Sequence, residues 1–122
     1  MRLVILESPF KAATEVDTIR NRRYAHEAML DSLHRGESPL ASHLLWPGIL
    51  NDADARERAM GIDAGLAWGR VADATVVYQD LGISPGMNSG IAHAIAHGRP
   101  VEYRSIRVGI KKASAEAEAS QV

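Results

Sequence analysis

Short runs of apolar residues alternate along the chain with longer segments in which apolar residues recur at helical spacing. A short apolar run bounded by turn residues is typical of a strand, whereas a repeat of three or four residues is typical of a helix. The pattern predicts strands over residues 3–6, 40–45, 74–78 and 101–106. It predicts helices from Thr14 to about Arg35, from Asn51 or Asp52 to about Gly69, and from Pro85 to His97.

Each predicted helix has a recognisable start or end and a stripe that we expect to be buried. Thr14 and Asp17 resemble a capping box with Asp in place of Glu, and Gly36 supplies a C-terminal stop. The residues expected in the core are Ala25, Met29 and Leu33 on the first helix, Trp68 on the second, and Met87, Ile91 and Ile95 on the third.

Strands that alternate with helices predict a mostly parallel sheet covered by helices. We therefore expect an α/β fold: a single flavodoxin-like (Rossmann-like) three-layer domain with four to five strands over residues 1–108. Residues 109–122 lack large apolar side chains apart from the ends of the segment, and this polar tail is expected to be a frayed helix or disordered. In such sheets ligands bind at the carboxyl ends of the strands.

The segment from Val76 to Ile91 is the most informative part of the chain, because it predicts a strand, a turn and a helix start. Ser84 suits the N-cap position, and Pro85 suits the first helical position. Gly86 lets a ligand approach the backbone closely. The free N–H groups of such a helix start favour an anion or a polar ligand, although the same turn can serve only to reverse the chain.

Composition narrows the range of partners. The net charge is −1, so we expect no nucleic-acid partner held by bulk electrostatics. No apolar run approaches membrane-spanning length, and the chain has no cysteine, which fits a cytoplasmic protein. His93 and His97 have metal-ligand spacing, but without a third ligand we expect no metal and no cofactor. The apolar loop over residues 44–50 predicts a homodimer or a larger even-numbered homo-oligomer.

Six motifs, in order, resemble a small domain of phage and bacterial genomes that is similar to nucleoside 2-deoxyribosyltransferases and nucleotide N-glycosidases. The resemblance covers about residues 1–106. The motifs are Ser8-Pro9-Phe10, Arg20-Asn21 with Tyr24-Ala25, Ala41 to Leu45, Glu57-Arg58 with Gly61-Ile62, Ser84 to Met87, and Gly98 to Val101.

The resemblance implies a nucleoside or nucleotide ligand and a carboxylate near the start of the third helix, beside the sugar C1′. In this chain the expected Glu position falls on Gly90, or on Asn88 or Ser89 if the alignment shifts. None of these residues is a carboxylate. The nearest one is Asp80, which is either a tentative catalytic residue and ribose ligand or a turn residue that bonds its own backbone.

The remaining candidate residues come from three loops and one helix, and each has a structural alternative. Phe10 either stacks on a base or packs under its loop, and His43 either contacts a base or phosphate or is a bonded structural histidine. Trp46 either lines the pocket or lies at a subunit contact. The full set of expected ligand-binding residues is Ser8, Pro9, Phe10, Arg20, Asn21, Tyr24, His43, Ser84, Gly86, Met87 and Asn88.

The resemblance and the missing Glu imply a nucleoside- or nucleotide-binding domain that binds its ligand without turnover. A phage protein that modifies nucleotide pools or sequesters a nucleotide signal would fit this prediction. One alternative is an active nucleoside 5′-monophosphate N-glycosidase that uses Asp80. The other is a structural or interaction domain with a vestigial cleft.

Overall fold

A computed structural model describes residues 1–107 of the chain. In chain order its elements are β1 (Arg2–Glu7), α1 (Glu15–His34), β2 (Glu37–Leu40), a 3₁₀ turn (Ser42–Leu44), α2 (Ala55–Gly69), β3 (Ala74–Tyr78), α3 (Pro85–Ala96) and β4 (Val101–Arg104). No helix within these residues is both long and apolar enough to cross a bilayer.

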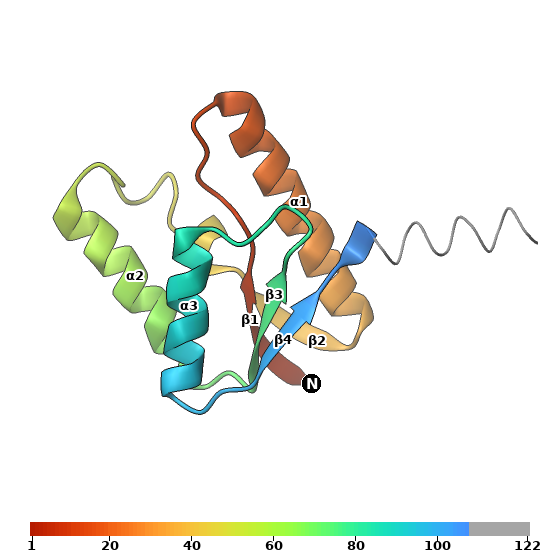
Figure 1. The fold of residues 1–122 in the computed structure, drawn as a ribbon. Helices are drawn as coiled ribbons and strands as arrows, with labels where there is room; N and C mark the ends of the chain where they lie inside the picture. Colours follow the sequence, from red (N-terminus) through yellow and green to blue (C-terminus); the bar gives the residue numbers. More distant parts are fainter. Residues whose placement is uncertain (108–122) are drawn as a thin grey trace, which may run out of the picture.

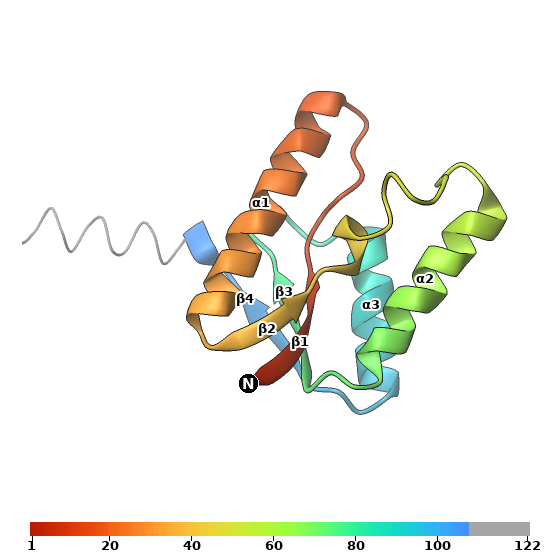
Figure 2. The ribbon, with the colours of Figure 1, turned by 180° about the vertical axis from the view of Figure 1, so that it is seen from behind.

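The four strands form one parallel sheet in the order β2-β1-β3-β4, which confirms the predicted α/β fold. Figures 1 and 2 show α1 on one face of this sheet, and α2 and α3 on the other. From β1 the chain continues to β2 on one side of the sheet, and from β3 it continues to β4 on the other side. The direction of the strand order therefore reverses between β1 and β3. The carboxyl ends of these two strands form the topological switch point, where ligands bind in open α/β sheets.

Alternation along the strands assigns side chains to the two faces. Val4, Leu6, Val76 and Tyr78 belong to the cluster that also contains Tyr24 of α1. On the other face, Val77 packs with Met87 and Ile91 of α3. Because neighbouring residues point to opposite faces, Glu7, which pairs with Val77, lies on the α3 side.

The helix starts follow the capping chemistry read from the sequence, with one change. Thr14 accepts a bond from the Asp17 backbone N–H at 3.1 Å, and Ser84 accepts one from the Met87 N–H at 3.3 Å. Pro85 opens α3 as predicted. The N-cap of α2 is Asp54, so the expected start at Asn51 or Asp52 is wrong by two or three residues.

Two predicted strands have different bounds. The second strand was expected at residues 40–45 but runs from Glu37 to Leu40, and residues 42–44 form the 3₁₀ turn. A strand that starts with a glutamate is stable here because the Glu37 carboxylate binds Arg104 from β4, a partner 67 residues away. The fourth strand ends at Arg104 instead of residue 106.

Three residues expected in the core are exposed: Leu33, Trp68 and Ile95. Leu33 follows Ser32, which occupies the inward position of α1, and Ile95 follows Ala94 on α3 in the same way. On α2 the inward face consists of Gly61, Gly65 and Gly69, which allow Trp46, Ser42 and Arg99, respectively, to approach the helix backbone closely. Trp68 therefore faces outward. The predicted tail lies outside the described residues.

Candidate functional site

The loops after β1 and β2 meet at the carboxyl edge of the sheet. Ser8 Oγ lies 2.8 Å from His43 Nε2, and the Phe10 ring meets the His43 ring edge-on with centroids 6.1 Å apart. Burial lowers the pKa of His43 to about 4, so its imidazole is neutral at physiological pH. The structure thus brings Ser8, Phe10 and His43 into one cluster, with Pro9 buried between the first two.

The α3 N-terminus is at the same edge, following β3. A Cβ built on Gly86 would meet no atom nearer than Ser84 Oγ at 4.0 Å, so the backbone is open on that side. Asn88 is exposed, whereas Met87 is buried in the core and its sulfur accepts a bond from the Ser84 N–H at 3.4 Å. Of these candidates, Gly86 and Asn88 present accessible surface, and Met87 fixes the helix start.

A residue that the sequence reasoning missed, Glu7, lies against α3 at Gly90. A Cβ built on Gly90 would stand 2.2 Å from Glu7 Oε1 and 2.7 Å from Glu7 Cδ, so the missing side chain is what makes room for the carboxyl group. Burial raises the pKa of Glu7 to about 7, against a smaller lowering by the positive charge of Arg99. The available signal was a glutamate at the end of the apolar strand over residues 3–6, directly before Ser8.

Arg99 is held away from direct pairing with Glu7 by three other partners. Its Nε donates to Thr75 Oγ1 at 2.9 Å and its Nη1 donates to the Gly69 carbonyl at 2.8 Å. Its Nη2 lies 3.3 Å from His93 Nδ1. Within residues 1–107 neither a hydrogen bond nor a salt bridge reaches the Glu7 carboxylate.

Asp80, the residue considered for catalysis, already accepts four hydrogen bonds. Its carboxylate accepts from Tyr24 Oη and Ser105 Oγ, both at 2.5 Å, and from the backbone N–H groups of Ile106 and Arg107 at 3.1 and 3.0 Å. Burial alone would raise the pKa of Asp80, but the bonds from Ser105, Tyr24 and the two backbone groups lower it to about 2. These bonds indicate that Asp80 anchors the segment after β4. A catalytic role for Asp80 stays a prediction.

Two of the α1 candidates are also engaged internally. Asn21 Nδ2 donates to the Phe10 carbonyl at 3.0 Å, and Tyr24 bonds both the carboxylate and the N–H of Asp80. They position the first loop and the end of β3. Arg20 is exposed and pairs with Asp17 at 3.4 Å.

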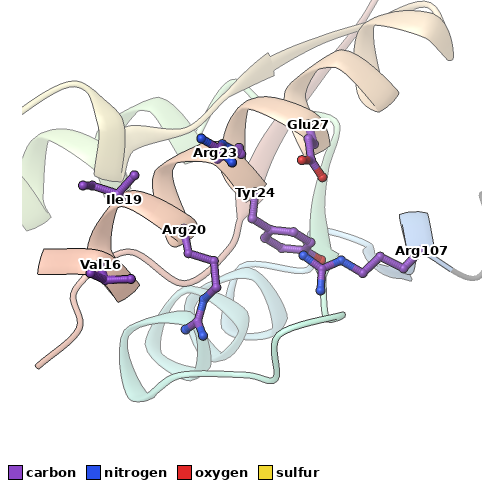
Figure 3. Close-up of a pocket in the computed structure, with 7 residues that line it drawn as sticks. All are labelled: Val16, Ile19, Arg20, Arg23, Tyr24, Glu27 and Arg107. Atoms are coloured by element: carbon purple, nitrogen blue, oxygen red, sulfur yellow. The ribbon is translucent and has the colours of Figure 1, made fainter. Parts of the chain in front are cut away.

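A cavity of about 410 Å³ opens on α1 beside Tyr24 (Figure 3). Its polar lining includes the guanidinium groups of Arg20, Arg23 and Arg107, opposed by one carboxylate, Glu27. Arg107 lies over the Tyr24 ring, 5.7 Å from its centroid. Because the Tyr24 hydroxyl bonds Asp80 at the end of β3, this cationic cavity adjoins the carboxyl edge.

Residues 2–104 match a family model described as a domain of unknown function, DUF7768. The match spans most of the chain, so the chain belongs to this family. No curated protein and no solved structure matched the sequence.

Proposed function

We propose that this member of the DUF7768 family binds a nucleoside or nucleotide at the carboxyl edge of its sheet. The observation that carries the proposal is the cluster formed by Ser8, Phe10 and His43 beside the β1/β3 switch point. It combines an aromatic ring, a neutral imidazole and a hydroxyl, which suit the face and the polar edge of a nucleobase. The resemblance to nucleoside 2-deoxyribosyltransferases points to the same ligand class.

The charges around the edge favour a ligand that carries phosphate. The open α3 N-terminus offers the backbone N–H of Gly86, since the Met87 and Asn88 N–H groups are bonded to Ser84. The cavity beside Tyr24 is lined by three arginines. We expect a nucleoside monophosphate to bind more tightly than its nucleoside. That difference should shrink as the salt concentration rises, because salt screens exposed charges.

Calorimetry and thermal shift with a panel of nucleosides and their 5′-monophosphates test this proposal. A ligand at about 100 times its Kd stabilises the folded state by about 2.7 kcal/mol, which gives a clear rise in Tm. His43→Ala should weaken binding at least about tenfold, the effect of one well-placed hydrogen bond to a ligand. His26→Ala is the matched control, because His26 is exposed on α1.

The result that would overturn the proposal is a panel in which no nucleoside or nucleotide shifts Tm or gives heat. Equal affinity for the wild type and His43→Ala would place the ligand elsewhere on the molecule. The structural or interaction alternative then gains support.

A further inference from the structure

The Glu7 carboxyl group occupies the space that a side chain at position 90 would fill. It reaches this place from the end of β1, one of the two strands at the switch point, and it lies on the face covered by α3. The Glu7 side chain is only partly covered, and Glu7 directly precedes Ser8, which contacts His43 at the carboxyl edge. The chain thus presents a carboxyl group beside α3 although α3 itself carries none there.

Two other carboxylates of the described region, Glu37 and Asp80, differ from Glu7 because each accepts several hydrogen bonds. Glu37 receives bonds from Arg104, Arg2 and Ser32, and Asp80 receives four. Glu7 alone among these three lacks a bonded partner in the described chain. An unpaired carboxyl group taken out of water is costly, and an amide or apolar side chain would fill the same space without that cost. A carboxyl group that carries this cost at the edge where ligands bind is a candidate for chemistry.

We propose that Glu7 is the proton-transferring carboxyl group of the carboxyl-edge site and that it protonates the departing base of a bound nucleoside. This inference rests on the proposed function, because it needs a nucleoside at that edge. It does not use Asp80, whose oxygens are already bonded. Glu7 acts first as an acid and then as a base, with water as the second reactant.

The step is balanced without any cofactor. The bond between the sugar C1′ and the base nitrogen breaks, its electron pair goes to that nitrogen, and the Glu7 proton is transferred to the base. A water oxygen then bonds C1′ and gives one proton back to the Glu7 carboxylate. The products are the free base and the sugar or sugar phosphate. A carboxyl group that is partly protonated near neutral pH is suited to both halves of this cycle.

The charged surroundings of Glu7 determine the pH range of this step. From the segment before β4, the Arg99 charge acts on Glu7, and the pKa of Glu7 is about 7. On α3, His93 is bonded to Arg99 and stacks on His97, and Arg70 at the end of α2 adds a further positive charge near His93. Because the acid form must be protonated, we expect the rate to fall as the pH rises above about 7.

The test is release of free base from 2′-deoxynucleosides and their 5′-monophosphates, followed by chromatography, with binding measured on the same samples. Glu7→Gln keeps the shape but has no proton to transfer, and should lower the rate at least about 100-fold while the Kd changes by less than about threefold. Glu7→Asp should retain a measurable rate. Glu15→Gln is the matched control and should leave the rate unchanged, because Glu15 is exposed at the start of α1.

The outcomes separate this inference from the proposed function. If the wild type binds a nucleotide but releases no base, or if Glu7→Gln releases base at the wild-type rate, the role of Glu7 is refuted and the binding function stands. If no nucleoside or nucleotide binds, the proposed function fails, and this inference fails with it. Loss of turnover in Glu7→Gln with retained binding and a falling rate above about pH 7 supports both.

Discussion

Two glutamates on opposite faces of the same sheet have opposite environments. Glu37 lies under α1, where Arg104 donates to both of its oxygens at 2.7 Å and Ser32 donates at 2.8 Å. Glu7 lies under α3 without a bonded partner in residues 1–107. The bonds from Arg104 lower the pKa of Glu37 to about 2, whereas burial raises that of Glu7 to about 7.

Glu37 therefore stabilises the fold through its bonded partners, whereas the unpaired Glu7 carboxyl group lowers stability. Arg104 also bonds Glu102 at 2.8 Å and the Tyr78 hydroxyl at 3.1 Å, so the ion network joins β2, β3 and β4 beneath α1. Within residues 1–107 Glu7 has no bonded partner, and the absence of a side chain at Gly90 makes room for its carboxyl group. Disrupting the Glu37–Arg104 network should therefore lower the free energy of unfolding. Removing the Glu7 carboxyl group should raise it.

The largest effect should come from breaking the network. Arg104→Met leaves the Glu37 carboxylate buried with incomplete pairing and should lower the free energy of unfolding by about 3 kcal/mol, because an uncompensated buried charge is costly. Urea denaturation measures it. Arg35→Met removes the exposed Arg35–Asp31 pair and should cost at most about 1 kcal/mol. Equal losses in the two variants would show that the network does not stabilise the α1 face.

The next largest effect concerns the pH dependence of Glu7. Because its pKa is raised from 4.5 to about 7 in the folded state, the folded state retains a proton that the unfolded state releases. Stability is therefore lost as the pH rises through this window, by about 3 kcal/mol. Glu7→Gln removes that loss, so denaturation should show a variant more stable than the wild type at about pH 8 and nearly equal at about pH 4.5.

Glu37 should show the opposite slope. Its pKa falls from 4.5 to about 2 on folding, so its stabilising contribution is present above pH 4.5 and is lost as the pH falls toward about 2.

For Glu7, a Glu7→Gln variant that is less stable than the wild type at about pH 8 would contradict the comparison. It would mean that the Glu7 carboxylate is paired after all.

The smallest effect is the coupling between Glu7 and Gly90. Gly90→Ala places a Cβ where the Glu7 carboxyl group stands, and the flexible end of Glu7 has to move aside. In the wild type this cost offsets the gain in helix propensity, whereas in a Glu7→Ala background the gain of about 1 kcal/mol should appear. The double-mutant cycle should therefore give a coupling of about 1 kcal/mol.

Gly86→Ala serves as the control for that cycle, because its Cβ would meet nothing nearer than 4.0 Å. Its effect should be the same in both backgrounds. A Gly90→Ala change that is independent of residue 7 would place the Glu7 carboxyl group away from α3.

Residues close together in the sequence were sufficient to predict some features of the fold. Other features depend on residues that are far apart in the chain. The cap at Ser84 and the parallel sheet follow from residue patterns that are local in the chain, and both are confirmed. The start of β2 could not be predicted, since Glu37 is stabilised by Arg104 of a distant strand. Asp80 appeared to be available for catalysis because its donors come from α1 and from residues 105–107, which only the folded chain brings together.

The candidate site shows the same limit. The resemblance places a Glu at Gly90, which has no carboxylate of its own, and the carboxyl group that lies against Gly90 comes from Glu7 of β1. The pairing of Glu7 with Val77 determines which face the Glu7 side chain occupies, and that register is a property of the sheet.

The most direct test of the account is a carboxyl-carbon NMR titration of Glu7, in the free protein and with a saturating nucleoside 5′-monophosphate. The account predicts a midpoint near pH 7 in the free protein, well above that of Glu37, and a Glu7 signal that shifts when the nucleotide is added. A Glu7 midpoint near the ordinary value of 4.5, together with a signal unaffected by any bound nucleotide, would contradict it.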